Sequence, residues 1–354
     1  MDFSEVKFGV LLSPEAVPRL IEDTVLCEKY GYDSAWWIDH LISYFPEHIV
    51  PEIFTTMAFM GDRTKKIVVG SCVADVLRRH PAAMAASVAT LDNMLDGRVI
   101  LGLGAGEAMN LRPFGIPTDN LYGKLREAIK VMKLLWGSSR EKQANFQGKF
   151  FNLTNAYLQI KPQTKPNPPI WVGAFGPKML EMTGELADGW LPFSHSPESY
   201  RVCLDGPIKT GAKKAGRTLN GFVPAMKPIA TIAKDSDEAR KIVLPQAKYV
   251  LMILPDVLKM VAPQIQHPGR EKLNVSNEPT DEEATGKIAE LSKNIPDEEA
   301  LKTVIWGNAE QCIEQIAQFI KAGCRYFVLD FRGPDTQQVI KEYAKKVIPY
   351  FRKK

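Results

Sequence analysis

The sequence predicts an α/β protein of the (β/α)8 TIM barrel class, and three observations support this prediction. Eight short apolar runs are spaced along the 354 residues. Most of these runs are followed by an amphipathic stretch of helix-forming residues, as in a parallel α/β protein. No strong break in composition divides the chain, which favours one barrel over two doubly wound domains. We therefore expect a single domain over residues 1–354.

The first half of the chain contains four predicted strand–helix units. The strands are expected at Val6–Leu12, Ser34–Ile38, Ile67–Val73 and Val99–Leu103. The helices are expected at Ala16–Tyr30, Pro51–Asp62, Pro81–Leu95 and Tyr122–Trp136. Proline at position 81 suits the first turn of a helix, where its missing N–H is not needed. The next segment, 145–162, is predicted to form a small hairpin outside the main repeat.

The second half resumes the alternation and contains one insertion. Strands are expected at Pro169–Ala174, Gly189–Phe193, Phe222–Ala233 and Tyr326–Phe331. Helices are expected near Lys178–Leu186, at Ser199–Ala215 and at Asp335–Phe351. Residues 235–297 are charged and poor in strand signals, so they are predicted to be a solvent-facing helical insertion in the barrel.

Composition limits the class of partner. The chain has 45 Lys and Arg residues against 41 Asp and Glu, a formal net charge of +4, and its basic residues are scattered, which does not indicate a nucleic-acid partner. No apolar run approaches the ~18–20 residues that span a bilayer, and the acidic N-terminus does not resemble a signal peptide. The five cysteines are dispersed without a CxxC pair, which fits a reducing compartment. We expect a cytoplasmic protein with a small-molecule substrate, no nucleic-acid or membrane partner and no metal.

The run "SAWWIDHLISYF" (34–45) ends an apolar strand in Asp39 and His40. A carboxylate and an imidazole cost free energy to bury without partners. They are therefore either a satisfied structural pair or catalytic groups. In a (β/α)8 barrel the active site lies at the C-terminal ends of the strands, and these two residues follow such an end.

Other predicted strands also end in polar residues or glycine. Strand four runs into "GLGAGEAMN", in which glycines allow a ligand to approach the backbone and Glu107 adds an acid. Strand five ends in Gly176 and Lys178 at a helix start, which is a plausible phosphate site. Acid/base groups beside a phosphate site indicate a phosphorylated cofactor and proton transfer.

Three further strand-end residues have a structural alternative. Glu15 follows strand one, where an acid also stabilises a helix N-terminus. Cys72 follows strand three and is equally a small buried apolar residue. Asp75 is equally a turn former.

Three segments carry a family resemblance: "DSAWWIDH", "RRHPAAMAASVATLDNMLDGRVILGLGAGEAMN" and "PPIWVGAFGPKMLEMTGELADGW". They resemble the bacterial luciferase-like superfamily, and more narrowly its members that use the deazaflavin coenzyme F420. The likeness extends from Lys7 to about residue 350 and is weakest at 235–297. It is closest to the secondary alcohol and glucose-6-phosphate dehydrogenases of that group.

The resemblance implies a role for each matching position. His40 and Glu107 would be the catalytic proton-transfer residues. The coenzyme would contact Asp39, Cys72, Val73, Asp75, Ala105, Gly106, Asn110, Phe175, Gly176, Lys178 and Met179. From the residues themselves we expect a substrate pocket that includes Glu15, Trp37, Tyr44 and Ser196, with apolar bulk from Trp36 or Trp37 and from Tyr44. The family also implies a cis peptide bond between Cys72 and Val73, and a homodimer or higher homo-oligomer.

Two departures narrow the expected substrate. The sugar-phosphate enzymes have a substrate lysine where "PFSHSPES" offers Ser196, which argues against glucose 6-phosphate. The methylenetetrahydromethanopterin reductases have a glutamate in strand one, where "GVLLSP" has Leu11 or Leu12. We therefore expect a coenzyme F420-dependent oxidoreductase acting on a secondary alcohol or ketone. The alternatives are that reductase, an FMN-dependent luciferase-like monooxygenase and a non-catalytic cofactor-binding protein.

Overall fold

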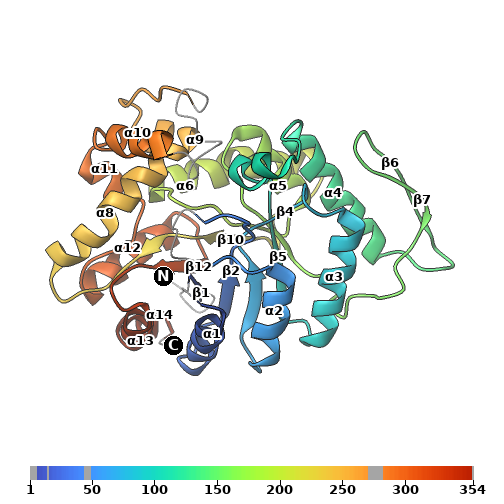
Figure 1. Ribbon diagram of the computed structural model, residues 1–354, viewed down its shortest axis with the longest axis horizontal. Coiled ribbons are helices and arrows are strands. Elements are labelled where there is room, and N and C mark those ends of the chain that lie inside the picture. Colours follow the sequence, from blue (N-terminus) through green and yellow to red (C-terminus); the bar gives the residue numbers. More distant parts are fainter. Residues whose placement is uncertain (1–5, 14–15, 44–48, 270–281, 353–354) are drawn as a thin grey trace.

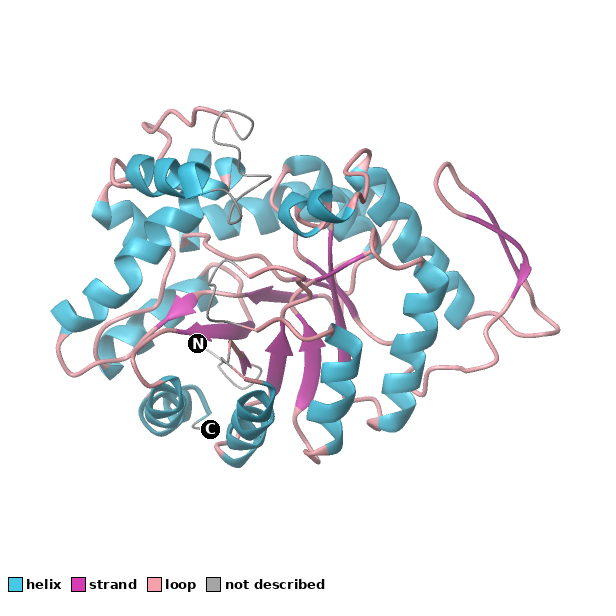
Figure 2. Cartoon of the chain, viewed as in Figure 1, coloured by secondary structure: helices cyan, strands magenta, loops and turns pink. Residues whose placement is uncertain are grey.

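A computed structural model describes residues 6–13, 16–43, 49–269 and 282–352. Eight parallel strands form a closed barrel with helices around it (Figures 1 and 2). In barrel order these strands are β1 (Lys7–Leu11), β2 (Ser34–Trp37), β3 (Val68–Ser71), β5 (Val99–Gly104), β8 (Ile170–Val172), β9 (Gly189–Trp190), β10 (Val223–Met226) and β12 (Tyr326–Phe331). The barrel closes because β12 also pairs with β1. The predicted fold class is confirmed.

The helices that cover the barrel bury their apolar faces against the outer side of the strands. They are α1 (Val17–Lys29), α2 (Ile53–Asp62), α3 (Pro81–Met94), α4 (Leu121–Trp136), α5 (Pro177–Leu186), α12 (Ala309–Lys321), α13 (Thr336–Lys346) and α14 (Ile348–Arg352). On α12 the buried residues Cys312, Ile316, Phe319 and Ile320 recur at helical spacing. Its start is a capping box between Asn308 and Gln311.

Side chains alternate between the inside and the outside of each strand. Trp36 points inward and lies in one cluster with Trp171 and Tyr326, with the two tryptophan rings 5.3 Å apart. Ser34 joins this interior, because its Oγ accepts hydrogen bonds from Trp36 Nε1 at 2.5 Å and Tyr326 Oη at 2.7 Å. The neighbouring Trp37 points outward into the larger core between strands and helices. The barrel interior is therefore filled below its C-terminal mouth.

Two excursions leave the regular repeat. The hairpin of β6 (Ala144–Gln147) and β7 (Asn152–Ala156) projects from one side of the molecule (Figure 1). The helices α8 (Ser236–Ile253), α9 (Pro255–Val261), α10 (Glu282–Ser292) and α11 (Asp297–Leu301) form a second apolar cluster. Phe175 and Phe193, which follow β8 and β9, pack against this cluster. The helical segment therefore reaches the C-terminal ends of the barrel strands.

Several predicted elements are interrupted. The expected strand Phe222–Ala233 is two strands, β10 and β11 (Ile229–Ala230), because Pro228 has no N–H to donate to a sheet. The expected helix Ser199–Ala215 consists of α6 (Pro197–Cys203), a π-helical turn η3 (Leu204–Ile208) and α7 (Lys209–Lys214). Beyond Ser71, the chain adds a short strand β4 (Ala74–Asp75) and, after β5, two 3₁₀ turns, η1 (Ala108–Asn110) and η2 (Arg112–Phe114).

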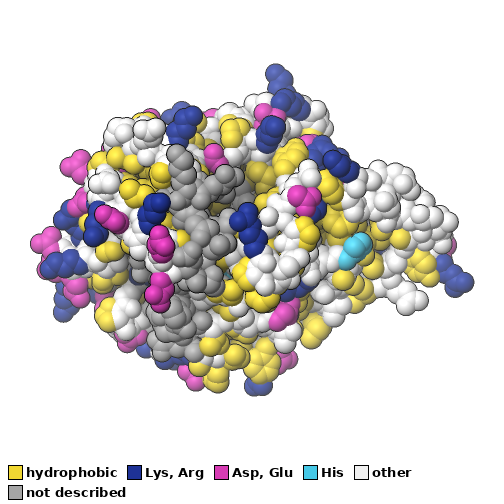
Figure 3. All heavy atoms as spheres, turned by 45° about the horizontal axis from the view of Figure 1, so that its top comes forward, with side chains coloured by type: hydrophobic (Ala, Val, Ile, Leu, Met, Phe, Trp, Pro, Cys, Tyr) yellow, Lys and Arg dark blue, Asp and Glu magenta, His cyan; other side chains and the backbone are white. Residues whose placement is uncertain are grey.

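The surface in Figure 3 has mixed charges, and the cysteines are unpaired. On the face in Figure 3, basic and acidic side chains are interspersed with hydrophobic ones. All five cysteines are free thiols. Within the described ranges, every helix is too short or too polar to cross a bilayer.

Candidate active site

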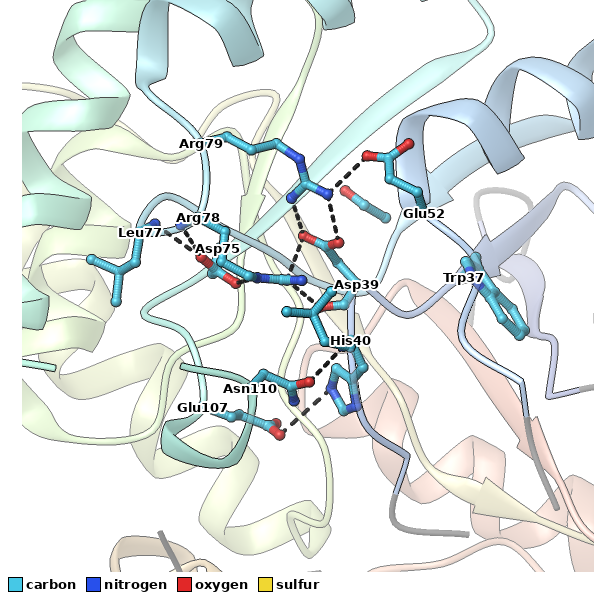
Figure 4. A network of polar contacts seen from close by, with 12 residues as sticks. Trp37, Asp39, His40, Glu52, Asp75, Leu77, Arg78, Arg79, Glu107 and Asn110 are labelled. Atoms are coloured by element: carbon cyan, nitrogen blue, oxygen red, sulfur yellow. Dashed lines mark hydrogen bonds and ion pairs between the residues drawn. The ribbon is translucent and has the colours of Figure 1, made fainter. Parts of the chain in front are cut away.

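The mouth of the barrel brings His40 and Glu107 together. Trp36 and Ile38 face the barrel interior, so alternation along β2 directs His40 inward as well. Glu107 follows β5 and the glycines after it. The Nε2 atom of His40 lies 3.5 Å from Oε2 of Glu107, with the imidazole 16% and the carboxylate 45% exposed. Figure 4 shows the two side chains pointing toward one another.

Asp39 points away from the mouth into a network of ion pairs (Figure 4). Its carboxylate is buried and lies 2.8 Å from Arg78 Nη2 and 2.7 Å from Arg79 Nη1. Arg78 also donates to the main-chain carbonyl of Asp39 and to Asp75, and Arg79 pairs with Glu52 at 2.8 Å. These contacts occupy the Asp39 carboxylate, and the direct coenzyme contact of Asp39 stays a prediction. They fix the main chain immediately before His40.

Asp75 is similarly occupied. Its Oδ1 accepts hydrogen bonds from the main-chain N–H groups of Leu77 and Arg78, both at 2.9 Å. Its Oδ2 pairs with the Arg78 side chain. The turn-forming alternative for Asp75 therefore describes this residue better than the coenzyme contact.

The backbone between β3 and β5 leaves little room for side chains. The Cys72–Val73 peptide bond is cis, as the resemblance implies. A Cβ atom at Gly104 would lie 2.6 Å from Val73 Cγ2, and Gly106 has a φ of +83°. Burial raises the pKa of the Cys72 thiol to about 12, so this cysteine is a neutral thiol. Glycine at these positions lets the chain pass close to Val73 and exposes the backbone of Ala105 and Gly106 to a ligand.

Asn110 holds the segment after His40. Its Oδ1 accepts hydrogen bonds from the N–H groups of Leu41 at 2.6 Å and Ile42 at 2.9 Å. Its Nδ2 is buried and has no hydrogen-bond partner among the described residues. A buried donor without a partner costs free energy. A ligand carbonyl would satisfy it, so this position fits the carbonyl-bearing ring of a deazaflavin.

The N-terminus of α5 offers main-chain N–H groups. Gly176 is its N-cap, and no side chain caps the helix there. Lys178 is exposed in the first turn, whereas Phe175 and Met179 are half-buried. A helix N-terminus attracts phosphate. One acid lies nearby, because a Cβ at Gly176 would be 3.5 Å from Asp256 Oδ2.

Of the four predicted substrate-pocket residues, the structure describes Trp37 and Ser196. Trp37 is fully buried, faces the outer core, and donates from Nε1 to the carbonyl of Pro51 at 3.2 Å. It therefore packs between barrel and helices, and Figure 4 shows it pointing away from His40. Ser196 is buried and caps α6 in a reciprocal capping box with Ser199. Glu15 and Tyr44 lie outside the described residues.

Four polar residues of the mouth were not predicted. Lys227 follows β10 and His195 follows β9, whereas Asp330 lies near the end of β12 and Arg332 directly after it. Ala225 and Val328 face the barrel interior. Because side chains alternate along a strand, Lys227 and Asp330, two residues further on, could have been predicted to face the mouth. His195 is fully buried, and this burial lowers its pKa to about 3, so its imidazole is neutral.

Known proteins are similar to this chain over most of its length. A family model for luciferase-like monooxygenases matches residues 3–326. An F420-dependent glucose-6-phosphate dehydrogenase from Microbacterium testaceum is 27% identical over 359 residues, covering 99% of this chain and 98% of the relative. A 5,10-methylenetetrahydromethanopterin reductase from Archaeoglobus fulgidus is 28% identical, covering 97% of this chain and 99% of the relative.

Solved structures have the same fold. An F420-dependent secondary alcohol dehydrogenase in complex with an F420–acetone adduct superposes with a TM-score of 0.81 at 23% identity, covering 99% of this chain and 100% of the other. The F420-dependent tetrahydromethanopterin reductase from Methanopyrus kandleri gives a TM-score of 0.80 at 25% identity, covering 98% of this chain and 99% of the other. Because the family model spans most of the sequence and the barrel matches, this chain belongs to the luciferase-like family.

Proposed function

We propose that this protein is a coenzyme F420-dependent oxidoreductase that interconverts a secondary alcohol and a ketone. The observation that carries the proposal is the approach of His40 Nε2 to Glu107 Oε2, 3.5 Å apart at the barrel mouth. The names of relatives that align over nearly the whole chain support it, since they are F420-dependent enzymes.

The residues around the mouth fit this coenzyme. The unpartnered Nδ2 of Asn110 would donate to a ring carbonyl. The Gly106 backbone would lie against the ring, and the N-terminus of α5 with Lys178 would hold the phosphate. When bound, the deazaflavin supplies the hydride acceptor or donor.

His40 would handle the proton. Oxidation of a secondary alcohol breaks the carbinol C–H bond, whose electron pair leaves as hydride to the coenzyme. It also breaks the O–H bond, whose proton passes to His40 Nε2 as the C=O bond forms. Glu107, partly exposed beside His40, would stabilise the resulting imidazolium and pass its proton toward solvent. Ketone reduction is the reverse.

Two observations favour an alcohol over the relatives' substrates. Ser196, at the position where the sugar-phosphate enzymes have a lysine, is buried and caps α6. Leu11 and Leu12, one of which stands where the reductases would have a glutamate, are both buried in apolar clusters. The second candidate is nevertheless methylenetetrahydromethanopterin reductase, which relatives at 27–28% identity support.

Titration of the purified protein with F420 and with FMN, followed by fluorescence, tests the coenzyme. Turnover with 2-butanol, glucose 6-phosphate and methylenetetrahydromethanopterin then tests the substrate. We expect F420 binding and reduction of F420 by 2-butanol or a related secondary alcohol. Tight binding of FMN alone would refute the F420 assignment. Turnover of only the pterin substrate would establish the second candidate, and F420 binding without turnover of any compound would favour a carrier.

A further inference from the structure

The barrel mouth contains a charged cluster that the proposed reaction does not use. Ala225 and Val328 lie in the apolar interior of the barrel. Two residues further along the chain are Lys227, directly after β10, and Asp330, within β12. The alternation of side chains along a strand therefore points both toward the same interior. Their charges also act on the Cys72 thiol at the end of β3. The cluster of Lys227, Asp330 and Arg332 therefore faces the site.

Within this charged cluster, one carboxylate oxygen of Asp330 is available to accept a hydrogen bond from a ligand. Oδ2 of Asp330 lies 2.9 Å from Arg332 Nη2 and 3.7 Å from Lys227 Nζ. Oδ1 of Asp330 is buried, the residue being 3% exposed, and has no hydrogen-bond partner among the described residues. A carboxylate oxygen in this state is an acceptor for a ligand O–H or N–H.

Lys227 is oriented but incompletely paired. Its ammonium lies 4.4 Å from the centroid of the Phe193 ring, a cation–π contact that holds the side chain beside this ring. Its 3.7 Å separation from Asp330 exceeds hydrogen-bond length. In the described part of the chain its ammonium donates no hydrogen bond, although the side chain is only 17% exposed. Phe193 also packs against the helical segment α8–α11, so Lys227 lies beside that wall of the site.

We propose that Lys227 and Asp330 form a substrate subsite for a carboxylate-bearing secondary alcohol or ketone. The ammonium of Lys227 binds the substrate carboxylate, and Asp330 Oδ1 accepts a hydrogen bond from a second polar group of the substrate. Two cations and one carboxylate give the cluster a net charge that matches a monoanion. A phosphate dianion would be left with uncompensated charge in a partly buried site. The substrate class rests on the proposed function, whereas the anion subsite does not.

A matched pair of probes tests this subsite. The compounds 3-hydroxybutyrate and 3-hydroxybutyramide have the same carbon frame and the same secondary alcohol, and differ in charge. Their Kd values for the F420-loaded protein are measured by calorimetry, and their kcat/KM values by F420 reduction. The variants are Lys227→Met and the conservative Lys227→Arg. The control is Lys149→Met. This variant also removes an ammonium that lies above a phenylalanine ring, but Lys149 belongs to the β6–β7 hairpin and not to the barrel mouth.

We expect the wild-type protein to bind the acid at least ~10-fold more tightly than the amide. Lys227→Met should abolish this preference with unchanged F420 affinity, Lys227→Arg should retain part of it, and Lys149→Met should retain all of it. Failure of the wild type to bind the acid would overturn the subsite, as would equal losses for acid and amide or a loss of F420 affinity in Lys227→Met. Lysine-dependent acid binding without turnover would support the subsite and count against the alcohol reaction. Turnover of both compounds that does not depend on Lys227 would support the alcohol reaction and count against the subsite.

Discussion

The imidazole Nε2 of His40 lies 3.5 Å from Oε2 of Glu107, although the two residues follow different strands, β2 and β5, with β3 between them. The pairing of β2 with β3 and of β3 with β5 brings these groups to one side of the mouth. The separation is slightly longer than a hydrogen bond. Catalytic contacts often shorten when substrate binds, so this spacing is compatible with proton exchange between the two side chains.

Replacing His40 with alanine should lower turnover by ~10²–10⁴-fold, because the alcohol proton loses its acceptor. F420 affinity should change little, since the imidazole is not expected to anchor the coenzyme. Steady-state F420 reduction and a fluorescence titration measure the two quantities. The control is His80→Asn, which replaces an exposed histidine at the N-cap of α3 with another good cap residue. Wild-type turnover in His40→Ala would remove this residue from the mechanism.

Asp39→Asn should destabilise the fold by about 3–5 kcal/mol. The carboxylate is buried between Arg78 and Arg79. Removing its charge leaves Arg78 with only Asp75 and Arg79 with only Glu52 as acidic partners among the described residues. The free energy of unfolding in urea measures this effect. Turnover should also fall, because the same contacts fix the main chain before His40.

Glu52→Gln is the matched control for the Asp39 network. Glu52 also pairs with Arg79, but its side chain is 47% exposed. Glutamine retains the oxygen that caps α2, so we expect a loss below ~1 kcal/mol. Equal losses in Asp39→Asn and Glu52→Gln would contradict the structural role of Asp39. A stable Asp39→Asn variant with weak F420 binding would instead support the direct coenzyme contact.

The barrel could be predicted from the sequence because its strands and helices follow local patterns, and the same patterns place His40 after a strand end. Apolar runs define the strands, and the barrel rule places strand ends at the site. The directions of Asp39 and Trp37 do not follow from their place after or within a strand alone. Alternation turns both away from the mouth, toward partners such as Arg79 and Pro51 that are remote in sequence.

The contact between Lys227 and Asp330 could not be predicted because the two residues are far apart in the sequence. Nothing local to Lys227 indicates that Asp330 will lie beside it, since only the neighbouring positions of β10 and β12 in the barrel join them. The helix α12 was a different kind of omission. Its capping box and helical spacing of buried residues were available in the sequence.

Lys178→Ala should weaken binding of F420 by roughly 3- to 10-fold and leave binding of the phosphate-free ribityl deazaflavin nearly unchanged. The reason is that an exposed cation at a helix N-terminus adds modest attraction for phosphate. Fluorescence titrations with both ligands provide the measurement. Lys213→Ala, which removes an exposed lysine from the last turn of α7, is the control. Equal losses for the two ligands would show that Lys178 does not contact the phosphate.

His195 should make the protein sensitive to mild acid. Its ring is fully buried between Phe175 and Trp190. Nδ1 lies 3.0 Å from Ser199 Oγ, and Nε2 has no partner within the described ranges. Burial lowers the pKa of His195 from 6.5 to about 3. The unfolded chain therefore takes up a proton near pH 6.5, whereas the folded chain does not.

This difference fixes the sign of the pH effect. The contribution of neutral His195 to stability is fully present above pH 6.5 and is lost as the pH falls toward 3. From pH 6 to 4.5 the wild type should lose about 1 kcal/mol for each pH unit relative to His195→Gln, which cannot take up this proton. Urea unfolding of both proteins across this range measures the difference, and carboxylates shared by both cancel in it. A stability difference that stays constant between pH 7 and 4.5 would mean that His195 is protonated equally in the folded and unfolded chains.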